Sequence, residues 1–187
     1  MPAAARSTRD QLDQLTLKRA QRGDERAWRD LIERYQQPVH SLVWRLFAGR
    51  ARHRVEDLVQ ETFVRVLEAL PEFDPAGTAT LSTWILTIAT RLALNELRKV
   101  EPRLDVQVES VERADVTAER KQLARAIGEA VAELPDAQRA AFVLREYHGL
   151  EYAEIASVLE LDLNTVKSRL NRARAALRAR LAPVRTA

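Results

Sequence analysis

The sequence predicts an all-α protein made of two small helical domains joined by an acidic linker. Glycine and proline number only 5 and 7 in 187 residues, whereas the helix-forming residues alanine, leucine, arginine and glutamate are plentiful. Apolar residues recur about every 3.6 positions over most of the chain and lose this period in one stretch near its middle. We therefore expect a first domain over residues 11–100, a linker over 101–118 and a second domain over 119–182.

The first two expected helices are separated by a glycine. A short helix over residues 11–22 ends at Gly23, and Asp24 caps the helix that follows. This second helix has an apolar stripe of about twenty residues, and Pro38 should kink or locally break it. The stripe consists of Trp28, Leu31, Ile32, Tyr35, Val39, Leu42, Val43, Leu46 and Phe47. Trp28 and Trp44 lie on or beside the stripe, so we interpret both as core residues rather than platforms for stacked bases.

A third helix is expected over residues 55–70. Near one side it carries its apolar residues, Leu58, Phe63, Val64, Val66 and Leu67. The acids in its first turns, Glu56, Asp57 and Glu61, favour the positive end of the helix dipole. Asp57, Gln60 and Glu61 also share one surface with Arg65, through spacings of three, four and eight residues. The pattern is compatible with simple helix stabilisation and with a protein-binding face.

A loop over residues 71–82 leads into a fourth helix over 83–100. The loop contains two prolines, a glycine and three hydroxyl residues. The inward positions of the helix are Trp84, Ile85, Ile88, Ala89, Leu92 and Leu97. Its outer side carries Thr87, Arg91, Asn95, Arg98 and Lys99. This polar, partly basic face beside a hydroxyl-containing loop suits contact with a nucleic acid, and an ordinary solvated face explains it equally well.

The middle of the chain is acidic, and two further helices follow it. Residues 101–119 hold six acids against two bases and have no helical period. The fifth helix begins near residue 119, is stopped by Pro135, and has an apolar side formed by Leu123, Ile127, Val131 and Leu134. Asp136 is expected to cap a sixth helix over 137–148, which Gly149 ends.

The stretch 151–181 has the pattern of a helix-turn-helix. Its apolar residues Ile155, Ala156, Leu159, Val166 and Leu170 are spaced as two short helices crossing at a tight turn require. Beyond Asp162 no acid follows, and seven bases do, at Lys167, Arg169, Arg172, Arg174, Arg178, Arg180 and Arg185. A basic helix of this kind is often only a solvated face, but the short helix and turn before it favour binding to a phosphate backbone.

Several classes of function are disfavoured. The chain has no cysteine, which excludes disulfides, thiolate metal sites and a catalytic thiol. Its three histidines are far apart, and only His53 and Glu56 have a metal-like spacing, so we expect no metal and no cofactor. Because we find no phosphate loop, catalytic carboxylate group or activated nucleophile, we expect no enzyme. No signal peptide or membrane span is recognisable, so we expect a soluble cytoplasmic protein without membrane insertion.

Three segments together resemble the extracytoplasmic function (ECF) group of bacterial sigma factors, in the sigma-70 superfamily. They are VEDLVQETFVRVLEAL, FDPAGTATLSTWILTIATRLALNELRK and, after the acidic linker, ELPDAQRAAFVLREYHGLEYAEIASVLELDLNTVKSRLNRARAAL. The likeness covers roughly residues 11–182 and relies on independent motifs in the right order. It implies a sigma region 2 domain, a linker that threads through RNA polymerase, and a sigma region 4 domain.

The resemblance also implies a role for individual residues. The segment that docks on the clamp of the largest polymerase subunit is matched by Asp57, Leu58, Gln60, Glu61 and Phe63. The region that opens and reads the −10 element, beside a loop at 74–82 for a flipped base, is matched by Thr83, Trp84, Arg91, Asn95, Arg98 and Lys99. The recognition helix for the −35 element is matched by Thr165, Val166, Lys167, Arg169, Leu170, Arg172 and Arg174.

The implied partners are core RNA polymerase, through the clamp and the flap of its second-largest subunit, promoter DNA, and an anti-sigma factor that clamps both domains. The implied location is the cytoplasm, with the nucleoid or a membrane-held anti-sigma factor as places of binding.

Four positions depart from the family pattern. Glu160 stands where the turn usually has glycine, and Arg91 stands where the −10 helix commonly has asparagine. Leu81 and Ser82 stand where an aromatic and a basic residue are common. The alternative function is that of a stand-alone helix-turn-helix DNA-binding transcriptional regulator. In such a protein the acidic face of the third helix and the acidic linker would have no evident function.

Overall fold

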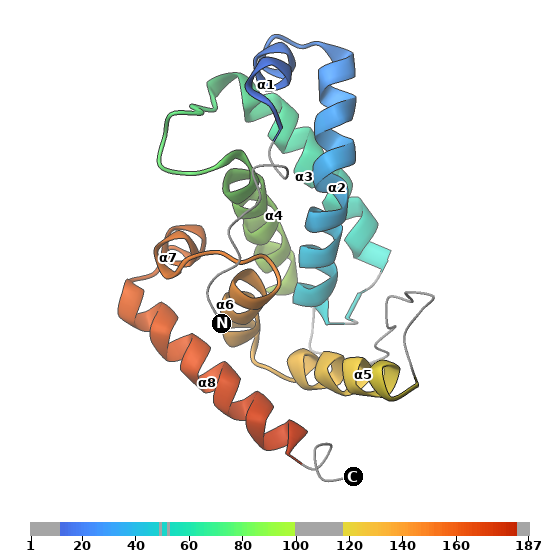
Figure 1. The fold of residues 1–187 in the computed structure, drawn as a ribbon, viewed down its shortest axis with the longest axis vertical. Coiled ribbons are helices and arrows are strands. Elements are labelled where there is room, and N and C mark those ends of the chain that lie inside the picture. Colours follow the sequence, from blue (N-terminus) through green and yellow to red (C-terminus); the bar gives the residue numbers. More distant parts are fainter. Residues whose placement is uncertain (1–11, 49, 52, 100–117, 183–187) are drawn as a thin grey trace.

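The computed structural model describes residues 12–48, 50–51, 53–99 and 118–182 (Figure 1). All regular secondary structure in these ranges is helical, which confirms the predicted all-α class. The helices are α1 (Gln14–Gln21), α2 (Glu25–Phe47), α3 (His53–Ala69), η2 (Leu70–Glu72), α4 (Leu81–Leu97), α5 (Ala118–Ala132), α6 (Asp136–Glu146), α7 (Tyr152–Leu159) and α8 (Leu163–Leu181). Apart from Ala118, the expected linker lies outside the described residues.

Aspartate caps define the starts of the first two helices. Asp13 accepts a hydrogen bond from the backbone N–H of Thr16, so α1 begins at Gln14 rather than at residue 11. Asp24 accepts from the N–H groups of Arg26 and Ala27, which confirms its predicted role as the cap of α2. Gly23, between the two helices, has a φ of +84°, a conformation that suits a residue without a side chain.

Helix α2 is the central helix of the fold. It packs against α1, α3 and α4, and also against α5 and α6 from the C-terminal half of the chain. The expected break at Pro38 does not occur, because α2 is continuous from Glu25 to Phe47. Buried residues on either side of the proline, including Tyr35 and Val39, hold the helix against its neighbours. Trp28 and Trp44 are half-buried against the core, as the sequence predicted.

Helices α3 and α4 complete the N-terminal half. Helix α3 buries Val55, Val59 and Val66, whereas Val64, which the sequence placed near the apolar side, is 55% exposed. The buried hydroxyl of Thr62 donates to the carbonyl oxygen of Leu58 at 2.7 Å, which satisfies it inside the core. Helix α4 begins at Leu81, two residues earlier than expected, because the side chain of Thr80 caps it.

The C-terminal half begins with α5 and α6. Val131 and Leu134 are buried as predicted, but Leu123, near the start of α5, is exposed. Asp136 is not the side-chain cap of α6: Pro135 occupies the cap position, and the Asp136 carboxylate instead accepts from two arginines. Gly149 follows α6 with a φ of +65°, which agrees with its predicted role in ending this helix.

The two halves of the chain pack directly against each other. Helix α7 lies on α4, and α6 and α5 lie on α2 (Figure 1). The buried apolar residues of α1–α4 and of α5–α8 belong to one continuous cluster. Helix α8 packs on α5, α6 and α7 and runs along the outside of the molecule.

Candidate polymerase-binding and DNA-binding surfaces

The predicted polymerase-binding residues of α3 separate into two groups. Asp57, Gln60 and Glu61 are exposed on one face of the helix. Glu61 accepts from Arg65 one turn further on, at 2.8 Å. Leu58 and Phe63 are only 3% and 6% exposed, so they belong to the core. The first group is available to a partner, and the second fixes the orientation of the helix that presents it.

The predicted −10 residues of α4 are divided in a different way. Asn95, Arg98 and Lys99 are exposed near the C-terminal end of the helix. Lys99 pairs with Glu96 at 3.2 Å, and this hydrogen bond, together with Arg54, lowers the pKa of the Glu96 carboxyl. Trp84 is half-buried and its ring lies 4.9 Å from that of Phe73. The basic end of α4 is therefore open to solvent.

Two other predicted −10 residues have partners in the C-terminal half of the chain. Thr83 is 5% exposed, and its hydroxyl donates to Oε1 of Glu154 on α7 at 2.8 Å. Arg91 lies 3.0 Å from Oε1 of Glu160, at the turn after α7. Sequence reasoning found Thr83 and Arg91 but not these partners, because a contact between distant segments leaves no local pattern.

The predicted −35 residues lie on α8, whose start is fixed by an aspartate. Asp162 accepts from the N–H of Thr165 at 2.9 Å and from its hydroxyl at 2.5 Å. These hydrogen bonds, led by the one from the hydroxyl, lower the pKa of the Asp162 carboxyl. Val166 and Leu170 are fully buried, so their part is to seat the helix.

The basic residues of α8 differ in how free they are to bind DNA. Lys167 and Arg172 are exposed, and Arg169 is partly exposed. Arg174, by contrast, pairs with Glu146 of α6 at 2.7 Å, and this interaction raises the pKa of its guanidinium. Among the predicted −35 residues, the bases that are available to a phosphate backbone therefore lie on the first half of α8, and Arg174 is paired with another helix of the same half of the chain.

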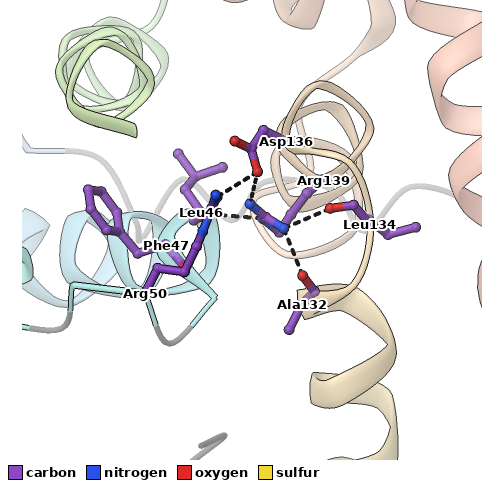
Figure 2. A network of polar contacts seen from close by, with 7 residues as sticks. All are labelled: Leu46, Phe47, Arg50, Ala132, Leu134, Asp136 and Arg139. Atoms are coloured by element: carbon purple, nitrogen blue, oxygen red, sulfur yellow. Dashed lines mark hydrogen bonds and ion pairs between the residues drawn. The ribbon is translucent and has the colours of Figure 1, made fainter. Parts of the chain in front are cut away.

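Sequence reasoning missed a buried arginine between the two halves (Figure 2). Arg139 of α6 is 2% exposed, and its Nε donates to the carbonyl oxygen of Leu46 at 2.9 Å. Its Nη1 donates to the carbonyls of Ala132 and Leu134 at 2.9 and 2.7 Å. Burial lowers the pKa of this guanidinium, against the opposing effect of the nearby Asp136 carboxylate. The sequence contained one signal that Arg139 is buried: it lies one turn before Val143, on the inward side of α6.

Asp136 joins this arginine to a second one. Its Oδ1 accepts from Arg139 of the same helix and from Arg50, just after α2, at 2.5 Å. We call Arg50, Asp136 and Arg139 the Arg139 cluster. Nearby, the guanidinium of Arg45 lies 4.2 Å from the ring centroid of Tyr147, at the end of α6. The junction between α2 and α6 is therefore polar, closely paired and partly buried.

His148 predicts a measurable pH dependence of stability. Burial, with a smaller effect of Arg45, lowers its pKa from 6.5 to about 4. Its buried Nε2 has no hydrogen-bond partner within the described ranges. Because the unfolded chain binds this proton more readily than the folded one, the contribution is fully present above pH 6.5 and declines as the pH falls towards 4. Between pH 7.5 and 5.0 this group should lower the unfolding free energy of the parent by about 2 kcal/mol. We expect that His148→Gln does not show this part of the decrease.

Urea unfolding at the two pH values measures this difference. His53, which is exposed on α3, supplies the control: His53→Gln should keep the parent's pH dependence. If His148→Gln and the parent lost the same free energy between the two pH values, another group would be responsible.

Two family models match separate parts of this chain. The model described as Sigma-70 region 2 matches residues 31–102, and that of Sigma-70, region 4 matches residues 124–177. Their order and position agree with the expected two-domain architecture. Together with the helix-turn-helix and the exposed acidic face of α3, they define the class of protein as an RNA polymerase sigma factor.

Similar proteins narrow the class. The ECF RNA polymerase sigma-E factor of Haemophilus influenzae is 31% identical, over 92% of this chain and 96% of its own length. The RNA polymerase sigma-H factor of Pseudomonas aeruginosa is 33% identical, over 92% and 95%. The chain therefore belongs to the ECF family of RNA polymerase sigma factors. As a member, it directs core RNA polymerase to promoter DNA.

Solved structures agree with this assignment. CnrH, in complex with the cytosolic domain of CnrY, matches 91% of this chain and 97% of its own with a TM-score of 0.63 and 30% identity. The sigma factor RpoE of Bartonella quintana, in complex with the anti-sigma factor NepR, matches 82% and 96% with a TM-score of 0.68. At 21% identity the second likeness concerns the fold alone.

No helix in the described ranges is long and apolar enough to cross a membrane. The same ranges contain no group of three or more histidine, aspartate or glutamate side chains placed to hold a metal ion.

Proposed function

We propose that this chain is a dissociable initiation subunit whose three surfaces act in sequence. The exposed face of α3 binds the polymerase clamp, the first half of α8 reads the −35 element, and α4 with the loop before it reads and opens the −10 element. The proposed domains are residues 11–100 and 119–182, joined by the acidic segment 101–118. The observation that carries the proposal is the exposed Asp57, Gln60 and Glu61 face in the same chain as a cationic recognition helix.

The chemistry of these surfaces suits binding rather than bond-making. An acidic helix face favours a basic partner surface and speeds encounter with it. The basic residues of α8 neutralise phosphates while its first turns reach base edges in the major groove. Opening the duplex requires capture of an unstacked base, at a cost on the order of a few kcal/mol. None of these roles needs a catalytic group, so we propose that the chain is not an enzyme.

An anti-sigma factor is the proposed regulator of this chain. The proposal is supported by membership of the ECF family and by CnrH, a 30% identical protein solved with the cytosolic domain of another protein. The proposed location is the cytoplasm, with the nucleoid as the place of action when polymerase is bound.

Promoter reading by α8 predicts a graded loss of affinity. We expect Arg169→Glu and Arg172→Glu to weaken promoter binding by the polymerase holoenzyme by about 1 to 3 kcal/mol each where the side chain reads a base. The measurement is holoenzyme binding to fragments from transcription start sites mapped after overexpression. Arg26→Glu and Arg29→Glu, at exposed positions of α2, make the same charge change away from α8. If the α8 variants bound promoter fragments as tightly as the parent, Arg169 and Arg172 would be solvated surface charges without a role in promoter reading.

The same binding experiment separates the sigma factor from a stand-alone regulator. A regulator binds its duplex site tightly without polymerase, and the α3 variants described in the Discussion leave that binding intact. A sigma factor of the proposed kind gains specific promoter binding only when core polymerase is present. Tight specific binding by the free chain would favour the regulator.

A further inference from the structure

We propose that two asparagines of α8, Asn164 and Asn171, each read an adenine in the major groove of the −35 element. The inference rests on the proposed function, since it names the bases that the recognition helix selects. The sequence pattern of α8 drew attention to its basic residues, and these two side chains carry no charge. Their structural basis is a shared position on the outer face of the helix, between basic residues.

Asn164 and Asn171 form a stripe along the outer face of α8. They are seven residues apart, nearly two helical turns, so they lie within about 20° of each other around the helix axis and about 10 Å apart along it. Both are exposed, on the side opposite to the buried Val166 and Ala173. Helix α8 itself runs along the outside of the molecule (Figure 1). The two amides therefore face a partner that approaches α8 from solvent.

Basic residues border this stripe on both sides. Lys167 lies about 60° from Asn164 around the helix axis in one direction, and Arg172 lies about 80° from it in the other. Both basic side chains are exposed. When a helix lies in the major groove, its central face points towards the base edges and its flanks face the two phosphate backbones. The charges of Lys167 and Arg172 therefore suit the phosphates, and the neutral amides between them suit the bases.

Several of the predicted −35 residues are less free to read a base. The hydroxyl of Thr165 donates to Asp162 at 2.5 Å, and its N–H donates to the same carboxylate at 2.9 Å. Val166 and Leu170 are fully buried. Arg174 is held by its ion pair with α6. The central face of α8 therefore depends on its two amides for a contact with a base at two points.

The chemistry of a side-chain amide selects adenine. An amide offers a hydrogen-bond acceptor with a donor beside it. In the major groove adenine presents the N7 acceptor beside the N6 amino donor, whereas guanine presents two acceptors, and cytosine and thymine present one polar group each. An asparagine can therefore pair at two points with adenine only. Because base pairs are stacked about 3.4 Å apart, amides about 10 Å apart predict adenines about three base pairs apart.

An asparagine in the middle of α8 is not explained by helix stability. Asparagine forms helices less readily than the leucine, arginine and alanine residues that surround Asn171. Binding to a base accounts for an amide at this exposed position. Since alanine is the best helix former, replacement of Asn164 or Asn171 by alanine should leave α8 folded.

Selection of −35 sequences by the polymerase holoenzyme tests this reading. Core polymerase with this protein is offered promoter fragments whose −35 element is randomised, and the bound fragments are sequenced. We expect adenine, on one strand or the other, at two positions about three base pairs apart. Each adenine should be preferred over the other bases by about fivefold to a hundredfold. Asn164→Ala should remove the preference at one position and Asn171→Ala at the other, while Gln37→Ala, at an exposed amide of α2, should leave both unchanged.

A modified base makes the comparison specific to one contact. The base 7-deazaadenine lacks the N7 acceptor and keeps its Watson–Crick pairing. At the adenine that Asn171 reads, it should weaken binding by the parent holoenzyme about as much as Asn171→Ala does. It should weaken binding by the Asn171→Ala holoenzyme by less than about twofold, because the contact is already absent.

Three results would overturn the inference while the proposed function stands. The selected −35 element could lack the two adenines, the alanine variants could keep the parent's preferences, or they could lose affinity for all fragments equally, as contacts to phosphate would. The same selection by the free chain, without core polymerase, separates the two proposals. Selection by the free chain alone would contradict the proposed function, and the alanine variants would still test the amides on the selected bases. Absence of any sequence selection in both experiments would contradict both proposals.

Discussion

Charge reversal at Asp57 and Glu61 should abolish binding to core RNA polymerase while the protein remains folded. Both side chains are exposed on α3, so their replacement by lysine removes no core contact. The double variant reverses the sign of the proposed docking face, and like charges across an interface cost several kcal/mol. We expect at least about a hundredfold loss of affinity, measured by co-purification with core polymerase and by titration with labelled protein.

A charge-matched variant makes this experiment specific. Asp30→Lys with Glu33→Lys introduces the same change at exposed positions of α2 in the same half of the chain. This control should bind polymerase nearly as well as the parent, and circular dichroism should show the parent's helix content in both variants. Retained co-purification of the Asp57 and Glu61 variant would remove α3 from the proposed interface.

Replacement of Arg139 by leucine should cause the largest loss of stability. The guanidinium is buried and donates to three backbone carbonyls, those of Leu46, Ala132 and Leu134. Leucine supplies no donor, so these buried acceptors lose their partner, and Asp136 keeps only Arg50. Each buried acceptor that is left without a partner costs about 1 to 3 kcal/mol, so we expect a loss of at least about 3 kcal/mol of unfolding free energy, which urea unfolding can measure directly.

An exposed arginine provides the comparison for Arg139. Arg125 of α5 pairs with Glu129 at 2.9 Å on the surface, and Arg125→Leu should change the unfolding free energy by less than about 1 kcal/mol. If Arg139→Leu were equally mild, water would have to satisfy the three carbonyls, and the junction between α2 and α6 would be looser than its contacts indicate.

Helix positions were predictable where the signal is local. Asp24 caps α2 through N–H groups two and three residues away, and such a cap can be recognised from residue type and spacing. Predictions failed where distant contacts decide. Asp136 has the right residue type for a cap, but Arg50, 86 residues away in sequence, and Arg139 use its carboxylate. Pro38 was expected to kink or locally break α2, and no break occurs, because packing on both sides keeps the helix continuous.

The candidate surfaces show the same limit. Periodicity placed Asp57, Gln60 and Glu61 together on α3, and the structure has all three exposed. It also placed Val64 near the apolar side of α3, although that side chain is solvent-exposed. No periodic signal could join Arg91 to Glu160 or Thr83 to Glu154, since each pair spans the two halves of the chain. Those contacts depend on how the halves pack, which a one-dimensional pattern does not contain.

Transcription by reconstituted polymerase tests the central claim most directly. Core enzyme is combined with this protein and with promoter fragments from mapped start sites, and run-off transcripts are measured. We predict specific transcripts that require both core enzyme and this protein, that are lost with the Asp57 and Glu61 reversals, and that persist with the Asp30 and Glu33 control. Absence of core-dependent transcription from every mapped promoter would contradict the account.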